Sequence, residues 1–412
     1  MVRESLPPEI QTMMRSPSWI ILKSAIAFPV SWRSFLFTLL RSNLKSAIRT
    51  VYTLLGIGIL HGTTFQKKLA AGALICCLTT HVDAGVVLLY HHVDEGTPAI
   101  TSIAPDQFNR HLDIIEAEGF TVLPLDELVK RSMDASSGPE KSDEKIVAIT
   151  FDDAYRSIYT TAFPNLQARG WPFTIFVATR MVEQKNPHYL TWAQLAEMST
   201  HGATIANHTD SHLHMIRRLD AEMADHWKGR MTGELLTAKG LLAKHGLDSN
   251  LFAYPYGEYD EKTLNLVGDL GMIGFGQQSG AIGPHSNPLL LPRYPLAGVY
   301  VGEAAFRDKL RSLPFPVLHP EVEPMVSDNF KPSLELSFIT DTLNLSRLTC
   351  YGPGGLMALS ETSNTNVLAT PAEEVSVGRT RYNCTLPKGN RFYWFSQLWI
   401  RKQSDGSWYH EP

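Results

Sequence analysis

Two adjacent carboxylates, Asp152 and Asp153, follow the apolar run IVAITF at residues 146–151. An aspartate in this place often caps the helix that follows a strand, because its side chain accepts backbone N–H groups. Adjacent carboxylates can instead divide two tasks, since neighbouring side chains leave the backbone in different directions. One can bind a metal ion while the other accepts a proton from a water molecule. This second interpretation requires further metal ligands elsewhere in the chain.

Candidate ligands lie in the stretch ATIANHTDSHLHM at residues 203–215, which contains His208 and His212. Two imidazoles four residues apart can converge on one ion where the chain turns, and His with Asp is a common ligand set for zinc and similar divalent metals. A His-rich surface loop can produce the same spacing without binding a metal. The combination with the aspartate pair favours a metal site, because both sets follow apolar runs.

A third apolar run ends in FAYPYGEYD at residues 252–260. Pro255 stiffens the backbone there, and Gly257 permits a tight turn beside Tyr256. These residues are also typical of an ordinary turn between a strand and a helix. A backbone N–H held in such a turn could instead stabilise an oxyanion.

The three stretches belong to a longer alternation of short apolar runs and amphipathic segments that begins at Gly85. The runs are GVVLLY, TVLPL, KIVAITF, FTIFVAT, ATIANHT, LFAYPYG, MIGFGQ and LLLPRYPL. Such alternation predicts an α/β fold, and seven or eight parallel strands over about 220 residues predict a closed or nearly closed (β/α) barrel across residues 85–313. Active-site residues are expected at the carboxyl ends of the strands, where Asp152, Asp153 and His208 are located.

The motifs TFDDAY, HTDSH and YPYG, in this order and spacing, resemble the first three motifs of the polysaccharide deacetylase family, also called the NodB-homology domain. The resemblance covers residues 85–298. It implies a general base at Asp152, metal ligands at Asp153, His208 and His212, and an oxyanion site at Tyr256. It also implies one divalent metal ion, with zinc expected first and cobalt, nickel or iron as alternatives.

Other parts of the chain add to this resemblance or depart from it. The run LLYHHV is similar to the opening strand of the subgroup that acts on exported N-acetylglucosamine polymers, which implies a place in the substrate pocket for His91. Ala253 stands where many relatives have an arginine. The family's late Leu-x-His motif is missing, and LPRYPL stands near its place. Arg293 within LPRYPL is expected to contact substrate. The general acid is not assigned, and its candidates are His91, His214 and His285.

Charge divides the 412 residues into a basic beginning and an acidic body. Residues 1–84 carry nine Lys/Arg against three Asp/Glu, a net charge of +6, which leaves −10 for residues 85–412 of a chain whose total is −4. An acidic body argues against nucleic acid as a partner, because binding to a phosphate backbone draws on clustered Lys/Arg.

The segment 1–84 is interpreted as an N-terminal extension that ends in a secretory signal. Lys67 and Lys68 precede the apolar segment 69–78, and a small-residue cleavage site ends at Ala84. About ten apolar residues fall short of the ~20 that cross a bilayer, so no stable membrane span is expected in the mature chain. Export to the periplasm or the outside of the cell is predicted.

The last part of the chain changes in character after a Pro-rich linker at residues 314–329. The short runs LELSFI, RLTCYG and RFYWFSQLWI predict a small β-sandwich at residues 330–412, in which Cys350 and Cys384 are expected to form a disulfide. Its aromatic residues admit two interpretations, a packed core or a platform that stacks on sugars: Tyr393, Trp394, Phe395, Trp399 and Trp408. All recognised motifs precede Gly298, so this region is expected to assist binding or stability and not the chemical step.

The expected function is metal-dependent hydrolysis of N-acetyl groups from an N-acetylglucosamine-containing polysaccharide, with release of acetate. The alternative is a non-catalytic carbohydrate-binding protein that retains the barrel. A glycoside hydrolase would need two carboxylates on opposite sides of the sugar, and the adjacent Asp152 and Asp153 are poorly placed for that.

Overall fold

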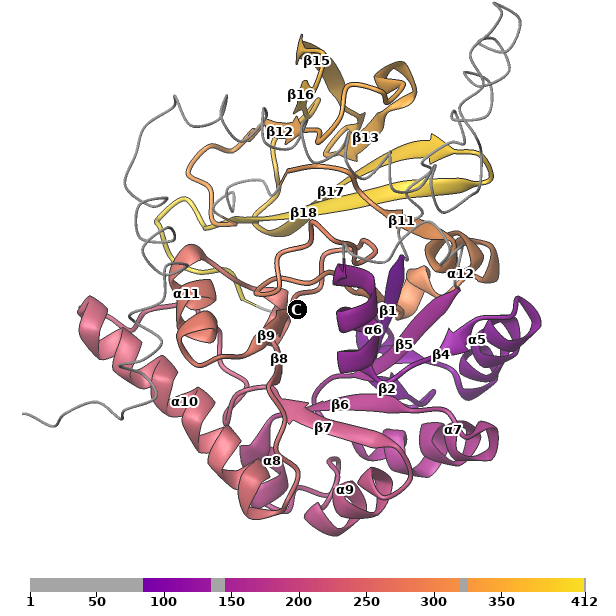
Figure 1. Cartoon of the computed structure of the whole chain (residues 1–412). Helices are drawn as coiled ribbons and strands as arrows, with labels where there is room; N and C mark the ends of the chain where they lie inside the picture. The colour runs from indigo at the N-terminus through magenta and orange to yellow at the C-terminus, as the bar shows by residue number, and fades with distance from the viewer. Residues whose placement is uncertain (1–83, 135–144, 319–324, 411–412) are drawn as a thin grey trace, which may run out of the picture. The chain divides into compact units, whose positions relative to one another are not determined.

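The computed structural model describes residues 84–134, 145–318 and 325–410. Its first part is an eight-stranded parallel sheet in the order β10-β1-β5-β6-β7-β8-β9, with β4 paired to β5 outside this path (Figure 1). The strands are β1 (Gly85–Tyr90), β4 (Thr121–Val122), β5 (Ile146–Phe151), β6 (Phe173–Val177), β7 (Ala203–Asn207), β8 (Leu251–Ala253), β9 (Ile273–Phe275) and β10 (Tyr294–Pro295). Because the strands are parallel, their carboxyl ends lie at one edge of the sheet.

The two ends of this sheet approach each other. β9 is bonded to the segment that leads into β10: the Gly276 N–H donates to the Leu291 carbonyl at 2.9 Å, and the Leu291 N–H donates to the Gly274 carbonyl at 2.8 Å. The sheet is therefore a distorted (β/α) barrel, which confirms the predicted fold class. β2 (His92–Val93) and β3 (Ser102–Ile103) form a separate parallel pair.

Helices surround the strands, as α5, α7, α9 and α10 show in Figure 1. They are α5 (Pro105–Ala117), α6 (Leu125–Met133), α7 (Phe163–Arg169), α8 (Thr179–Glu183), α9 (Trp192–Ser199), α10 (Ala224–Lys244), α11 (Glu261–Asp269) and α12 (Glu303–Leu310). In α10 the buried residues recur every three or four positions: Trp227, Met231, Leu235, Ala238 and Leu242. This spacing places them on one face of the helix. β1 and β5 are buried along their whole length, as expected of strands covered on both sides.

The C-terminal part contains two further sheets. One has the order β11-β18-β17-β13-β14 and the other β12-β16-β15. Their strands are β11 (Ser312–Pro314), β12 (Leu334–Ser337), β13 (Thr349–Gly352), β14 (Gly355–Leu356), β15 (Ala358–Ser363), β16 (Asn366–Thr370), β17 (Gly378–Lys388) and β18 (Arg391–Arg401). Leu336 and Val367 of the smaller sheet share one core with Tyr382 and Trp399 of the larger, so the two sheets form the predicted sandwich. The expected disulfide joins Cys350 to Cys384 across β13 and β17.

The long hairpin of β17 and β18 serves two cores. Trp399 is 2% exposed and belongs to the core of the sandwich, whereas Leu398 and Ile400 belong to the core that includes Trp227 and Met231 of α10. Alternate residues of a strand face opposite sides, so one strand can supply both cores. For Trp399 the interpretation as core residue is confirmed.

The barrel and the sandwich fall within one compact unit of the chain. The predicted domain boundaries at residues 313 and 329 stay predictions. The N-terminal extension, Lys67, Lys68 and the signal segment lie outside the described residues, of which Ala84 is the first. Among the helices of the described part, none is long and apolar enough to cross a membrane.

Candidate active site

The carboxyl ends of β5 and β7 bring three ligand atoms together. Asp153 follows β5, and His208 directly follows β7. The Asp153 Oδ1 lies 3.3 Å from the His208 Nε2 and 3.0 Å from the His212 Nε2. Ligand atoms of the three residues all lie within 4.8 Å of one another. The predicted ligands therefore converge on one point, although they come from two strands.

The backbone at this point leaves the ordinary strand and helix regions. Asp153 has a φ of 70° and His212 a φ of 57°, in the left-handed region that non-glycine residues rarely occupy. The His212 N–H donates to the Thr209 Oγ1 at 3.0 Å and supports this turn. Uncommon backbone conformations of this kind concentrate at functional sites.

The hydrogen bonds of the cluster fit a bound cation. The His208 Nδ1 donates to the Ala253 carbonyl at 2.7 Å, which leaves the Nε2 with its lone pair toward Asp153. The Asp153 Oδ1 is buried and makes no hydrogen bond of acceptable geometry within the described chain, although both ring nitrogens are near. Lone pairs that face one another in this way suit a divalent ion with N and O ligands.

Asp152 is held by Arg293, which directly precedes β10, the last strand of the barrel in the chain. The Arg293 Nη1 and Nη2 donate to the Asp152 Oδ1 and Oδ2 at 2.7 and 2.8 Å, and both side chains are fully buried. Burial raises the pKa of Asp152, but the charge and hydrogen bonds of Arg293 outweigh it and hold this pKa below its ordinary value. Arg293 also donates from its Nε to the Gly276 carbonyl at 2.9 Å.

This placement corrects the prediction for Arg293. The sequence predicts a contact with substrate, whereas the guanidinium is 0% exposed and bonded in bidentate fashion to Asp152. Planar two-point pairing is the geometry in which an arginine fixes a carboxylate. Arg293 is therefore a positioning residue for Asp152.

The turn after β8 carries Tyr256 within the 3₁₀ segment Pro255–Gly257. Tyr256 has a φ of 61°, and its ring lies 4.5 Å from the His212 ring and stacks at 3.8 Å on His214. Gly257 is required here, because it has a φ of 67° and an added Cβ would come within 2.7 Å of the Gln277 side chain. The turn thus holds Tyr256 beside His212, and its role at an oxyanion site stays a prediction.

Residues 140–274 match the family model described as polysaccharide deacetylase. The matched range includes Asp152, Asp153, His208, His212 and Tyr256. The chain contains a polysaccharide deacetylase domain. Arg293 and the whole sandwich lie after the matched range.

Known proteins similar to this chain include two from bacteria. The Bacillus subtilis (strain 168) protein YxkH, which is named as a polysaccharide deacetylase, is 30% identical over 47% of this chain and 65% of its own length. A poly-beta-1,6-N-acetyl-D-glucosamine N-deacetylase of Staphylococcus aureus (strain MSSA476) is 25% identical over 47% of this chain and 67% of its own length. The chain thus covers slightly less than two thirds of the length of YxkH.

A solved structure of the deacetylase PplD from Streptococcus pyogenes, in complex with acetate, is also similar. The identity is 23%, the match covers 56% of this chain and 99% of that chain, and the TM-score is 0.49.

Behind Tyr256 the deacetylase domain holds a second acid–histidine cluster that sequence reasoning missed. Glu258 is 0% exposed; its Oε2 accepts a hydrogen bond from the His214 Nδ1 at 2.8 Å, and its Oε1 accepts one from the Tyr409 hydroxyl at 2.7 Å. Burial raises the pKa of Glu258, but the hydrogen bonds from His214 and Tyr409 hold this pKa below its ordinary value. Glu258 lies two residues after Tyr256, so the cluster supports the turn directly.

The C-terminal region reaches the turn at Tyr256 and the neighbouring Glu258 at two points. Tyr409 bonds Glu258, and the Arg379 Nη1 of β17 donates to the Tyr256 carbonyl at 3.1 Å. The Arg379 guanidinium also lies 5.6 Å from the centre of the Tyr256 ring. No local sequence pattern marks these contacts, because the partners lie more than a hundred residues apart. The expectation that this region assists binding or stability and not the chemical step stays a prediction, and these contacts are of the supporting kind.

The other predicted histidines lie in different surroundings. His91 follows β1; burial lowers its pKa, and Asp153, Asp152 and Arg293 are among the charges that act on it. The place of His91 in the substrate pocket stays a prediction. His285 is exposed and lines a separate cavity.

Proposed function

We propose that this protein hydrolyses N-acetyl groups of an N-acetylglucosamine-containing polysaccharide and releases acetate, with one divalent metal ion as cofactor. The observation that carries the proposal is the convergence of Asp153, His208 and His212 beside Asp152, which Arg293 holds in place. Zinc is the first choice of metal because of the N and O ligand set, with cobalt, nickel or iron as alternatives.

Asp152 is the proposed general base. Arg293 orients both of its oxygens and keeps the carboxylate ionised, and only an ionised carboxylate can accept the proton of the attacking water. A divalent ion held by Asp153, His208 and His212 supplies Lewis acidity when bound. The low pKa of Asp152 makes it a weak base, so it depends on such acidity for proton transfer near neutral pH.

The turn at Tyr256 is the proposed oxyanion site. Its backbone is held by Gly257, by the Glu258 cluster and by Arg379, so a donor at this turn is already oriented before substrate binds. Preorganised donors stabilise developing charge without reorganisation. The stacked rings of Tyr256 and His214 and the nearby His91 are proposed to contact the sugar.

The substrate class and location rest on different observations. The S. aureus relative is named for a poly-β-1,6-linked N-acetylglucosamine polymer, which supports a polysaccharide of this sugar. The disulfide between Cys350 and Cys384 supports export, because disulfides persist in oxidising compartments. Periplasmic or extracellular action after signal cleavage near Ala84 is proposed.

Acetate release from N-acetylglucosamine oligomers tests the proposal. The full chain, supplied with zinc, is incubated with β-1,4-linked and β-1,6-linked oligomers, and acetate and oligomer length are measured together. Acetate release without shortening is expected, and Asp152→Asn should abolish most of it. Binding without acetate would indicate a non-catalytic carbohydrate-binding protein. Shortened oligomers without acetate would indicate a glycoside hydrolase.

A further inference from the structure

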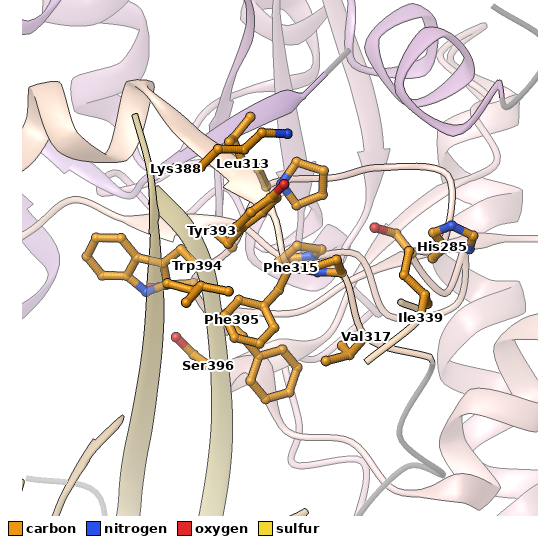
Figure 2. Close-up of a pocket in the computed structure, with 18 of the residues that line it drawn as sticks. His285, Leu313, Phe315, Val317, Ile339, Lys388, Tyr393, Trp394, Phe395 and Ser396 are labelled. Carbon is orange, nitrogen blue, oxygen red and sulfur yellow. The ribbon is translucent and has the colours of Figure 1, made fainter. Parts of the chain in front are cut away.

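A cavity of about 890 Å³ lies between the loop at residues 278–292, the segment 313–317 and strand β18. Figure 2 shows Tyr393 and Phe395 on the β18 side of this cavity, with Phe315 and Val317 beside them. A volume of this size is typical of sites for small molecules. None of the proposed metal ligands lines it. It is therefore a different site from the one described above.

The cavity and the active site share one loop. Gln278 lines the cavity, and its carbonyl accepts the Arg293 N–H at 3.0 Å. The Gly276 carbonyl of the same loop accepts from the Arg293 Nε, and this guanidinium holds Asp152. A molecule in the cavity would therefore contact the same loop that positions the proposed base.

The interior of the cavity is mainly apolar. Its lining includes a group of aliphatic and aromatic side chains contributed by the segment 313–317, the loop after β12 and the β17–β18 hairpin. Members of this group are Leu313, Phe315, Val317, Ile339, Leu386 and Tyr393. Such a lining favours a ligand with an apolar body, because each CH₂ moved out of water contributes to binding.

The charged residues of the lining all have one sign. Arg347, Lys388 and Arg391 line the cavity, and no Asp or Glu does, although the chain from residue 85 onward carries a net charge of −10. Lys388 and Arg347 are exposed and form no ion pair within the described residues. The Lys388 Nζ lies 5.3 Å from the centre of the Tyr393 ring, so a cation lies next to the apolar surface. Cations that no carboxylate neutralises favour an anionic group on the ligand.

We propose that this cavity binds an amphiphilic anion, a single acyl chain that ends in a carboxylate. The chain would contact Phe315, Val317 and Tyr393, and the head group would lie near Lys388 and Arg347. The deacetylated polymer does not match this site, because its ammonium groups would face the same cations. A neutral saccharide would make no use of the charges of Lys388 and Arg347. The experiment must therefore distinguish saccharide binding from acyl-chain binding.

Calorimetric titration of the full chain with dodecanoate, below its micelle concentration, tests the proposal. Saturable binding of one molecule is expected, and decanoate should bind about 15-fold more weakly because it lacks two CH₂ groups. Dodecyl maltoside, with a neutral head, should bind more weakly than dodecanoate, and dodecyltrimethylammonium most weakly. Equal affinity for all three head groups would overturn the role of the cations.

A double variant with a matched control locates the binding. Lys388→Glu with Arg347→Glu should weaken dodecanoate binding about tenfold or more, since like charges would then meet at the head group. Lys130→Glu with Lys262→Glu changes charge equally on the exposed faces of α6 and α11 and should leave binding unchanged. Both double variants should fold, because all four side chains are exposed.

Three results would contradict the proposal: no saturable dodecanoate binding, equal weakening in both double variants, or displacement of dodecanoate by an N-acetylglucosamine hexamer. The last result would identify a saccharide site in place of an acyl-chain site.

Discussion

Asp153 and Glu258 are buried carboxylates that lie against histidine side chains, and their oxygens are satisfied differently. The Asp153 Oδ1 faces the Nε2 atoms of His208 and His212 without a hydrogen bond of acceptable geometry within the described chain. Both oxygens of Glu258 accept hydrogen bonds, from His214 and from a residue of the C-terminal region.

This difference distinguishes the proposed metal ligands around Asp153 from the cluster around Glu258 that supports the turn at Tyr256. Buried polar atoms are normally hydrogen-bonded, so an exception such as Asp153 Oδ1 points to a partner of another kind, here a cation. A carboxylate that is fully bonded, such as Glu258, stabilises the arrangement of its neighbours. Carboxylate and imidazole side chains thus serve two tasks in this protein, and their surroundings decide which task each cluster serves.

The largest effect is expected when the ligand set is broken. Asp153→Asn removes a charged ligand, so bound metal and acetate release should fall together, the latter by about 10³-fold or more, since the metal supplies several kcal/mol of stabilisation. Elemental analysis of the purified variant, beside the acetate assay, measures both. His208→Ala and His212→Ala should behave alike. A variant that keeps its full metal content would place the ion elsewhere.

The proposed base should be separable from the ligands. Asp152→Asn leaves Asp153, His208 and His212 in place, so the metal should be retained while turnover falls by about 10²–10⁴-fold, the range associated with loss of a general base. The same two measurements apply. Near-normal turnover would show that Asp152 is a helix cap, and loss of metal would show that the roles of the two aspartates are exchanged.

Changes to the Glu258 cluster, which supports the turn at Tyr256, should lower turnover without lowering the metal content. Tyr409→Phe removes one hydrogen bond to Glu258, so the free energy of unfolding should fall by about 1–3 kcal/mol and turnover by up to about tenfold, as the turn at Tyr256 loses its support. Metal content should not change. kcat and KM, measured with a soluble oligomer, should show the loss in kcat.

Tyr382→Phe is the matched control for that change. Its hydroxyl donates to the Pro332 carbonyl within the sandwich, so the variant also loses a buried hydrogen bond, but away from the barrel site. Stability should fall while kcat stays unchanged. If Tyr409→Phe and Tyr382→Phe lower turnover equally, the loss follows from reduced stability in general. The Glu258 cluster would then have no specific role in supporting the turn at Tyr256.

The smallest effect concerns the pH dependence of stability. The pKa of Glu258 in the folded protein lies below its ordinary value of 4.5, so the ionised carboxylate contributes stability above pH 4.5 that is lost as pH falls through the folded-state pKa. The difference in unfolding free energy between the protein and Glu258→Gln should therefore shrink below pH 4.5. Urea unfolding over a series of pH values measures it, and a constant difference at all acidic pH values would refute the assignment.

Much of the barrel could be predicted because its signals are local. Apolar runs such as residues 146–151 and the helical spacing of α10 follow from short-range periodicity, and Asp153 and His208 stand directly after such runs. The sandwich and its disulfide follow from similarly local runs and from the cysteine count. The irregular link between β9 and the segment before β10 has no such signal.

Short segments of the sequence specify the reactive groups and the strands that carry them, since residue type and strand ends are local properties. Which charges meet depends on how the whole chain folds. Arg293 reaches Asp152 across 141 positions and Tyr409 reaches Glu258 across 151, distances over which no pattern in one sequence specifies a partner. The physical reason is that burial makes an unpaired charge or polar group unfavourable, and the fold alone determines which groups are close enough to satisfy one another.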